Sequence, residues 1–290
     1  MIEASAQVNG VRLHYRRAGQ GPLVMLLHGW PQTGYCWRHL IGPLAADYTV
    51  VAPDLRGYGR SDKPRDGYDK RSMAADVRAL VAHLGFDRVA LVAHDRGARV
   101  AHRYAVDAPD EVDALVVMDI VPTREVWARM DADLARRCWH WLFHLQPDLP
   151  ELLTGANVAA YVQYFLERWT VNRNAFDDAA IDHYVRAYRQ PGALRASFDD
   201  YRATFPTDAE HDDVDATAGR RLAMPVLALW GAGGIYDQLP TLDIWRAYAT
   251  DVRGAAIADC GHFLQEEQPA VVLEHLREFL AETVNRRQLA

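Results

Sequence analysis

Residues 91–100 read Leu91-Val92-Ala93-His94-Asp95-Arg96-Gly97-Ala98-Arg99-Val100. The apolar run from Val89 to Val92 is typical of a buried parallel strand. The run ends abruptly before Asp95, and a helical pattern begins directly after it. Small residues, Ala93 and Gly97, stand two positions to either side, as a turn requires where strand and helix backbones nearly touch. The sequence therefore predicts a sharp strand–turn–helix that presents the Asp95 side chain.

This pattern resembles the nucleophile elbow of the α/β-hydrolase fold, with Ala93 in place of the usual glycine. The nucleophile position holds Asp rather than Ser or Cys, which argues against ordinary esterase and lipase chemistry. A carboxylate is already anionic at neutral pH and can displace a leaving group from an sp³ carbon without a base. The product is an ester of the enzyme itself. A histidine and a second acid are therefore needed elsewhere to activate the water that hydrolyses it.

The rest of the chain fits this fold. Strands are expected at residues 22–27, 48–53, 89–92, 114–118, 225–230 and 255–258, after an N-terminal hairpin around Asn9-Gly10. From residue 123 to 219 the alternation of strands and helices gives way to helical, aromatic-rich sequence. We predict an α/β class protein with the α/β-hydrolase fold: a mostly parallel eight-stranded sheet, helices on both faces and an inserted helical cap. The core domain comprises residues 1–122 and 220–290, and the cap comprises 123–219.

Two local expectations concern segments near this predicted site. Ser72 is expected to cap the N-terminus of a helix over residues 72–84. The acidic run from Asp208 to Asp215 is expected to be a solvated loop.

Composition limits the function classes. The chain has 290 residues, 50% of them hydrophobic and 24% charged, which suits one large α/β domain with an insertion. A net charge of −7 argues against nucleic acid and anionic membranes as partners. The N-terminus has no signal-peptide pattern, and no apolar run approaches transmembrane length. Three scattered cysteines, Cys36, Cys138 and Cys260, predict reduced thiols in a cytoplasmic protein.

The histidine and the acid are sought where parallel strands end. His262 follows the last predicted strand, the position of the base in this fold. The acid has two candidates. In many hydrolases of this fold it lies in a Trp-Gly-x-x-Asp pattern, but here residues 230–234 lack it, and Asp237 three residues further on is a reserve. Asp119, at the end of the strand 114–118, occupies the other known location and is the acid that we expect.

Backbone and side-chain donors surround the nucleophile. The His28-Gly29-Trp30-Pro31 loop is expected to supply one oxyanion-hole N–H from Trp30, and Arg96 the other. The side chains of Arg96 and Arg99 lie in the first turn of the helix after Asp95. They could form an ordinary surface salt bridge. Because the elbow directs this turn into the pocket, we favour two-point binding of a substrate carboxylate.

Several motifs together resemble the fluoroacetate dehalogenases over nearly the whole chain, cap included. They are His94-Asp95-Arg96-Gly97-x-Arg99, Asp119-Ile120-x-Pro122-Thr123, His140-Trp141, Asp200-Tyr201-Arg202-Ala203 and Gly261-His262-Phe263. The resemblance implies hydrolysis of fluoroacetate and other haloacetates to glycolate and halide, in a homodimer without cofactor or metal. It assigns the nucleophile to Asp95, the acid to Asp119, the base to His262, carboxylate binding to Arg96 and Arg99, and halide binding to His140, Trp141 and Tyr201.

The sequence leaves other roles for the cap residues and other functions of the protein open. Trp141 and Tyr201 could be plain core, and His140 with His144 could suggest a metal pair but lacks a third ligand. An epoxide hydrolase also uses an Asp nucleophile and would protonate its substrate with cap tyrosines, for which Tyr161, Tyr164, Tyr184 and Tyr188 are available. That enzyme, like a dehalogenase of neutral haloalkanes, has no use for a carboxylate clamp. A non-catalytic receptor of the same fold is disfavoured by the intact Asp, His and acid.

Overall fold

A computed structural model describes residues 1–285, so residues 286–290 of the predicted core segment lie outside the described part. Eight strands form one sheet in the order β1-β2-β4-β3-β5-β6-β7-β8. The strands are β1 (Ile2–Val8), β2 (Val11–Ala18), β3 (Leu23–Leu27), β4 (Thr49–Pro53), β5 (Val89–His94), β6 (Val112–Met118), β7 (Val226–Gly231) and β8 (Val252–Ile257). Only the pairings of β2 with β1 and with β4 are antiparallel. The predicted eight-stranded, mostly parallel sheet is confirmed.

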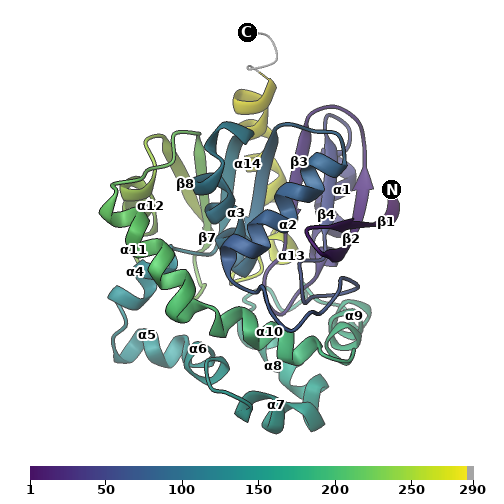
Figure 1. The fold of residues 1–290 in the computed structure, drawn as a ribbon, viewed down its shortest axis with the longest axis vertical. Coiled ribbons are helices and arrows are strands. Elements are labelled where there is room, and N and C mark those ends of the chain that lie inside the picture. Colours follow the sequence, from purple (N-terminus) through teal and green to yellow (C-terminus); the bar gives the residue numbers. More distant parts are fainter. Residues whose placement is uncertain (286–290) are drawn as a thin grey trace.

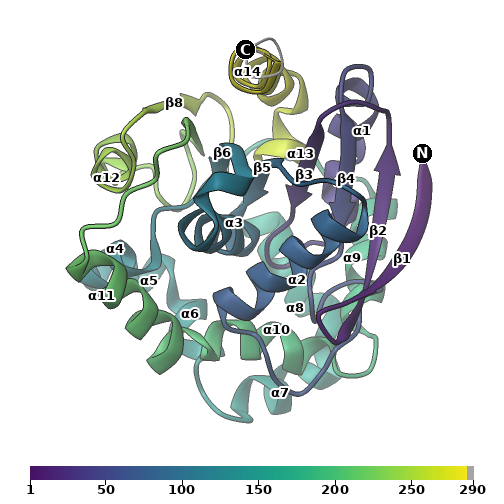
Figure 2. The same ribbon diagram turned by 45° about the horizontal axis from the view of Figure 1, so that its top comes forward.

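Helices cover both faces of the sheet (Figures 1 and 2). On one face α2 (Lys70–His83) packs beside α3 (Asp95–Asp107), and on the other α1 (Arg38–Leu44) packs beside α14 (Pro269–Leu280). The remaining helices of this part are η1 (Gly34–Trp37), η2 (Pro109–Glu111), α12 (Thr241–Tyr248), α13 (Leu264–Glu267) and η5 (Ala281–Asn285). Within residues 1–285, none of the helices has the length and apolarity needed to cross a membrane.

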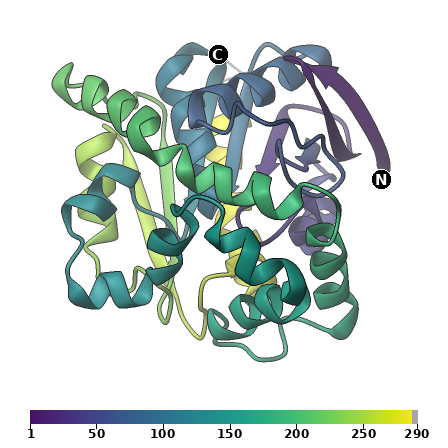
Figure 3. The same ribbon diagram turned by 60° about the horizontal axis from the view of Figure 1, so that its bottom comes forward.

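The chain between β6 and β7 forms helices only, and they lie across the end of the sheet at which β5 and β6 terminate (Figure 3). They are α4 (Thr123–Ala128), α5 (Ala132–Arg137), α6 (Trp139–His144), α7 (Leu149–Thr154), η3 (Gly155–Asn157), α8 (Val158–Arg168), α9 (Asp178–Tyr188), α10 (Ala193–Arg202), η4 (Thr204–Asp208) and α11 (Ala209–Thr217). We call this segment the cap. Its treatment as a domain separate from the core remains a proposal.

Two local expectations were wrong. The acidic run is not a loop but ends η4 and forms most of α11, and an ion pair between Asp215 and Arg103 of α3 ties it to the core. Helix α2 begins at Lys70, not at Ser72, because Asp69 is the N-cap and accepts a hydrogen bond from the Ser72 N–H at 2.9 Å. The ion pair of Asp215 and the hydrogen bond of Asp69 are contacts that the local sequence pattern does not reveal.

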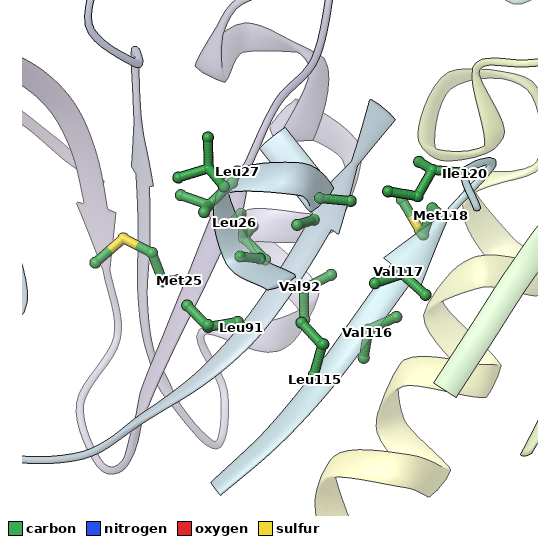
Figure 4. Packing of buried hydrophobic residues seen from close by; sticks show 14 of the residues in the cluster. Met25, Leu26, Leu27, Leu91, Val92, Leu115, Val116, Val117, Met118 and Ile120 are labelled. Carbon is green, nitrogen blue, oxygen red and sulfur yellow. The ribbon is translucent and has the colours of Figure 1, made fainter. Parts of the chain in front are cut away.

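The centre of the sheet positions the predicted nucleophile. Side chains of β3, β5 and β6 pack together without solvent exposure, including Leu26, Leu91 and Val116 (Figure 4). Burial on both faces explains why these strands are continuously apolar rather than alternating. Directly after β5 the backbone turns into α3, and a Cβ at Gly97 would collide with the carbonyl oxygen of His28. Glycine is therefore required there to let α3 start against the loop that follows β3.

Candidate active site

Asp95 lies at the junction of β5 and α3 with a positive φ of 46°. Non-glycine residues rarely adopt this conformation, and such strain often marks a functional position. The residue is 6% exposed, and its Oδ2 accepts a hydrogen bond from the Trp30 N–H at 3.0 Å. Burial alone would raise the pKa of Asp95, but neighbouring positive charges, that of His262 foremost, hold it below its usual value. Asp95 is therefore a carboxylate at neutral pH, with Oδ1 as the oxygen that can attack.

His262 follows β8, and its Nδ1–H donates to Oδ2 of Asp119 at 2.6 Å. The other ring nitrogen, Nε2, lies 3.9 Å from Oδ1 of Asp95 and is buried without a hydrogen-bond partner among the described residues. Burial alone would lower the pKa of His262, but the hydrogen bond to Asp119 reverses this effect and raises it. An imidazole in this position can take a proton from a water molecule that lies beside Asp95.

The structure distinguishes the two acids that the sequence left open. Asp119 follows β6, is fully buried, and also accepts a hydrogen bond from the Gly231 N–H at 3.1 Å, which fixes its orientation. Burial raises the pKa of this carboxyl group. Asp237 instead forms an ion pair with Arg137 of the cap at 2.9 Å. Asp119, and not Asp237, is thus the acid in contact with His262.

The loop after β3 brings the predicted oxyanion-hole donor to the nucleophile. A Cβ at Gly29 would lie 2.5 Å from Cβ of Asp95 and 2.6 Å from its Oδ2, so only glycine allows this approach. The Trp30 N–H therefore lies where the prediction requires it. Arg96 stands in the first turn of α3, where N–H groups have no acceptor within their own helix. Its N–H as the second donor stays a prediction.

Arg96 and Arg99 are buried, at 1% and 4% exposed, so they do not form a surface salt bridge. The Nη2 of Arg96 donates to Oδ1 of Asp200 at 2.7 Å. The Nη1 of Arg99 donates to Oγ1 of Thr123 at 2.7 Å, and its guanidinium lies 4.7 Å from the ring centroid of Trp141. In residues 1–285, Nε and Nη1 of Arg96 and Nε of Arg99 are buried without an acceptor. Because buried N–H groups are seldom left unpaired, these are donors available to an anionic ligand.

The three cap residues assigned to halide binding are buried together. The ring centroid of Tyr201 lies 5.9 Å from that of His140 and 6.1 Å from that of Trp141. The Trp30 indole contacts both His140 and Tyr201, which places the group above the oxyanion loop. Burial lowers the pKa of His140 and raises that of Tyr201, so both are neutral at neutral pH and keep a hydrogen to donate. The structure brings the three side chains together, and their role stays a prediction.

The tyrosines that left epoxide chemistry open are not equivalent. The hydroxyl groups of Tyr161 and Tyr184 form hydrogen bonds with other side chains, and Tyr164 is 47% exposed. Tyr188 is buried, and its hydroxyl has no hydrogen-bond partner of acceptable geometry among the described residues. Burial and nearby carboxylates, including Asp95, raise its pKa well above the usual value. Of these four, Tyr188 is therefore the buried tyrosine whose protonated hydroxyl no described side chain holds in good hydrogen-bond geometry, although the Ser197 side chain lies close to it.

One group of three described side chains has ligand atoms close enough to hold a metal ion: Asp69, Asp208 and His211, within 4.8 Å of one another. The Lys70 ammonium lies 3.5 Å from Oδ2 of Asp208 and would repel a second cation. Both carboxylates also accept hydrogen bonds from backbone N–H groups at the start of α2. These residues fit a helix cap better than a metal site.

Sequence reasoning gave no role to the residues behind Arg96. Asp200 is fully buried and receives hydrogen bonds from Arg96, Lys70 and Tyr58. In the sequence Asp200 stands out only as the residue before Tyr201 in the motif Asp200-Tyr201-Arg202-Ala203. An acid beside a predicted pocket residue, in a chain with two arginines at the nucleophile, was a usable signal. Lys70 and Tyr58 carried none, because they are more than a hundred residues away from Asp200 in the chain.

Comparisons with known proteins agree with this geometry. The family model described as "alpha/beta hydrolase fold" matches residues 22–269. The chain is 39% identical to the soluble epoxide hydrolase of Corynebacterium sp. (strain C12), an alignment that covers 95% of this chain and 96% of that protein. It is 38% identical to the fluoroacetate dehalogenase of Burkholderia sp, covering 95% of this chain and 92% of the relative.

A solved structure is also similar over nearly the whole chain. The epoxide hydrolase CorEH without ligand superposes with a TM-score of 0.90 at 37% sequence identity, covering 97% of this chain and 99% of that chain. The two sequence relatives have different activities at almost equal identity. Similarity therefore supports a hydrolase and leaves the substrate to be argued from the site.

Proposed function

The chain belongs to the α/β-hydrolase fold family and is a hydrolase, and from that premise we propose that it cleaves the carbon–halogen bond of fluoroacetate and related haloacetates. The products are glycolate and halide. The observation that carries the proposal is the pair of buried arginines beside Asp95, with N–H groups of Arg96 and Arg99 that lack an acceptor. These buried donors suit a substrate that brings its own carboxylate, and a neutral epoxide or haloalkane would leave the unpaired N–H groups of both arginines without an anionic acceptor.

In the first step Oδ1 of Asp95 attacks the carbon that carries the halogen, and the carbon–halogen electron pair leaves with the halide. The arginines hold the substrate carboxylate, which places this carbon in line with Oδ1. Donors from His140, Trp141 and Tyr201 meet the charge that grows on the halogen. No proton moves in this step, and its product is a carboxymethyl ester of Asp95.

In the second step a water molecule attacks the carbonyl carbon of the ester. His262 takes one proton from the water through Nε2, and Asp119 stabilises the imidazolium that forms. The Trp30 N–H, which donates to Oδ2 of Asp95, stabilises the oxyanion. When the intermediate collapses, His262 returns its proton to the departing glycolate oxygen. The second proton of the water passes to solvent, which restores the Asp95 carboxylate.

Fluoride release from fluoroacetate by the purified protein tests the proposal. Fluoroacetamide is the matched control, because it has the same fluorinated carbon and no carboxylate. We expect release from fluoroacetate and none from the amide. Equal release from both substrates would mean that the arginines do not select a carboxylate, and no release from fluoroacetate would refute the proposal.

Epoxide hydrolysis is the second candidate, and Tyr188 is the observation that favours it. A protonated tyrosine hydroxyl near Asp95 could donate to the oxygen of an epoxide as the ring opens. Diol formation from a neutral epoxide, abolished in Tyr188→Phe, would support this candidate. The dehalogenase proposal expects Tyr188→Phe to leave fluoride release within about threefold of the wild type, since the mutation removes one hydroxyl that neither step uses.

Further properties are proposed with this function. The steps above use groups of the protein and one water molecule, so we propose that no cofactor or metal takes part. Within residues 1–285 all three cysteines are free and buried, as expected of a cytoplasmic protein. We also propose a homodimer, which light scattering on the purified protein would test.

A further inference from the structure

The two buried arginines differ in how their charges are balanced. Arg96 donates to Oδ1 of Asp200 at 2.7 Å and also to the Asp200 backbone carbonyl oxygen. Arg99 donates to neutral acceptors, Oγ1 of Thr123 at 2.7 Å and the carbonyl oxygen of Val121 at 3.2 Å. No carboxylate of the described residues forms an ion pair with Arg99. Arg96 therefore has a carboxylate in direct contact, whereas the charge of Arg99 acts on Asp95 and Asp212 without such a contact.

Asp200, in α10 of the cap, is held by three side-chain donors, all from the core. Besides Arg96, the Lys70 ammonium bonds to Oδ1, and the Tyr58 hydroxyl donates to Oδ2 at 2.5 Å. All four side chains are buried, with Lys70 the most accessible at 5% exposed. Burial alone would raise the pKa of Asp200, but Arg96 and Lys70 lower it, so the carboxylate stays ionised. With both of its oxygens held by buried donors, the Asp200 carboxylate has little freedom to rotate.

The chain of charges continues beyond Asp200. The Lys70 ammonium lies 3.5 Å from Oδ2 of Asp208, where the cap returns to the core. The sequence of charges is Arg96 positive, Asp200 negative, Lys70 positive and Asp208 negative, which sums to zero. Within these four side chains the charges balance, and Arg99 is the buried cation beside Asp95 whose charge no carboxylate of this series offsets.

We infer that the two arginines divide the binding of the substrate carboxylate: Arg99 supplies the charge, and Arg96 supplies direction because Lys70, Tyr58 and Asp200 hold it in place. The inference rests on the proposed function. With Nη2 fixed by Asp200 and the guanidinium 4.2 Å from the Tyr201 ring centroid, the plane of Arg96 is set. Its unpaired Nε and Nη1 then keep one orientation, since a guanidinium is rigid and planar.

Lys70 is the informative member, because it touches Asp200 and is not a ligand of the substrate in this scheme. Its removal would leave the series with a net negative charge and would free Asp200 on one side. Both changes disfavour a carboxylate bound at Arg96. Lys70 is therefore a positioning residue, and so is Tyr58, whose hydroxyl fixes the other oxygen of Asp200.

The test is calorimetric binding of acetate, a carboxylate without a halogen, together with inhibition of turnover by bromide ion. For Lys70→Met we expect acetate binding to weaken by about tenfold or more, because a charge-assisted hydrogen bond at Arg96 loses its geometry. Bromide inhibition should stay within about twofold, since Lys70 forms no hydrogen bond with the proposed halide donors His140, Trp141 and Tyr201. Lys70→Arg, which keeps the charge, should restore much of the acetate binding.

Lys63→Met is the control, because Lys63 is a partly buried lysine that donates to backbone carbonyl oxygens and to Gln190 and forms no hydrogen bond with Asp200. It should bind acetate as the wild type does. Tyr58→Phe removes a single hydroxyl and gives a second test if Lys70→Met folds poorly; it should weaken acetate binding in the same direction by a smaller factor.

The outcomes separate the two proposals. If the wild type releases fluoride and binds acetate, but Lys70→Met and Tyr58→Phe bind acetate equally well, the positioning role is wrong and the proposed function stands. Equal weakening of acetate and bromide would indicate general loss of structure and would also overturn the inference. If the wild type neither binds acetate nor releases fluoride, the proposed function is wrong, and the division of roles between the arginines is wrong with it.

Discussion

Replacing Trp141 by Phe tests the halide site most sharply. Trp141 is 3% exposed, and its ring lies 6.1 Å from Tyr201 and 4.7 Å from the Arg99 guanidinium. Phenylalanine keeps an aromatic ring in this environment and removes the indole N–H. The variant therefore deletes one of three proposed donors and leaves most of the packing in place.

The magnitude follows from the two contacts of Trp141. A preorganised donor to charge that develops in the transition state contributes about 2.7–4 kcal/mol, or roughly 10²–10³ in kcat. The cation–π contact with Arg99 weakens when the ring becomes smaller, at a cost of about 0.5–1 kcal/mol, and this loss is common to all haloacetates. Fluoride is small, strongly hydrated and a poor leaving group, so it should need the donor far more than chloride does.

The assay compares kcat for fluoroacetate and chloroacetate in one preparation of each protein. We expect Trp141→Phe to reduce defluorination by about a hundredfold or more and dechlorination by less than about tenfold. The ratio of the two losses is the decisive number, because the Arg99 contribution and any shortage of folded protein cancel in it. Equal losses would refute the halide role and leave Trp141 as a packing residue.

Three further predictions concern the base, the acid and metal ions. Asp119→Asn should lower kcat for fluoride release by about 10⁴-fold, as loss of the acid does in the Ser-His-Asp triad. Asp237→Asn should retain activity, because Asp237 pairs with Arg137. Similar losses of fluoride release in the two variants would contradict the assignment of Asp119. His262 must be neutral to act as a base and its pKa is raised, so ester hydrolysis should slow as the pH falls through that pKa. Ester formation should not slow there, since the pKa of Asp95 is lowered; quenched single turnovers across pH separate the steps, and a shared profile would speak against the assignment. Dialysis against a chelator should leave fluoride release unchanged, and loss restored by a divalent cation would show that a metal takes part.

The fold and the nucleophile could be predicted from the sequence because the residues that indicate them are consecutive in the chain. The buried strand β5, the turn at Asp95 and the first turn of α3 occupy consecutive residues, and small residues at the turn have a steric reason. The choice between Asp119 and Asp237 was harder. It depended on which carboxyl group reaches His262 once the loops after β6 and β7 have folded, and a single segment does not show that.

The parts that could not be predicted depend on contacts between distant segments. Asp200 meets Arg96 and Lys70 only after the cap folds over the core, and no periodicity connects these positions. The prediction of a solvated loop for the acidic run from Asp208 to Asp215 was wrong for a similar reason. Its helix α11 has no apolar stripe, and the ion pair of Asp215 with Arg103 joins it to α3.

The most direct test of the central claim is one turnover of fluoroacetate in ¹⁸O-labelled water with the enzyme in excess. If Oδ1 of Asp95 attacks carbon and water then attacks the ester carbonyl, the label enters the Asp95 carboxylate and the glycolate stays unlabelled. Peptide mass analysis locates the label in the protein, and mass analysis of glycolate measures the product. Labelled glycolate from the first turnover, with unlabelled Asp95, would show that water attacks the substrate directly and would contradict the account.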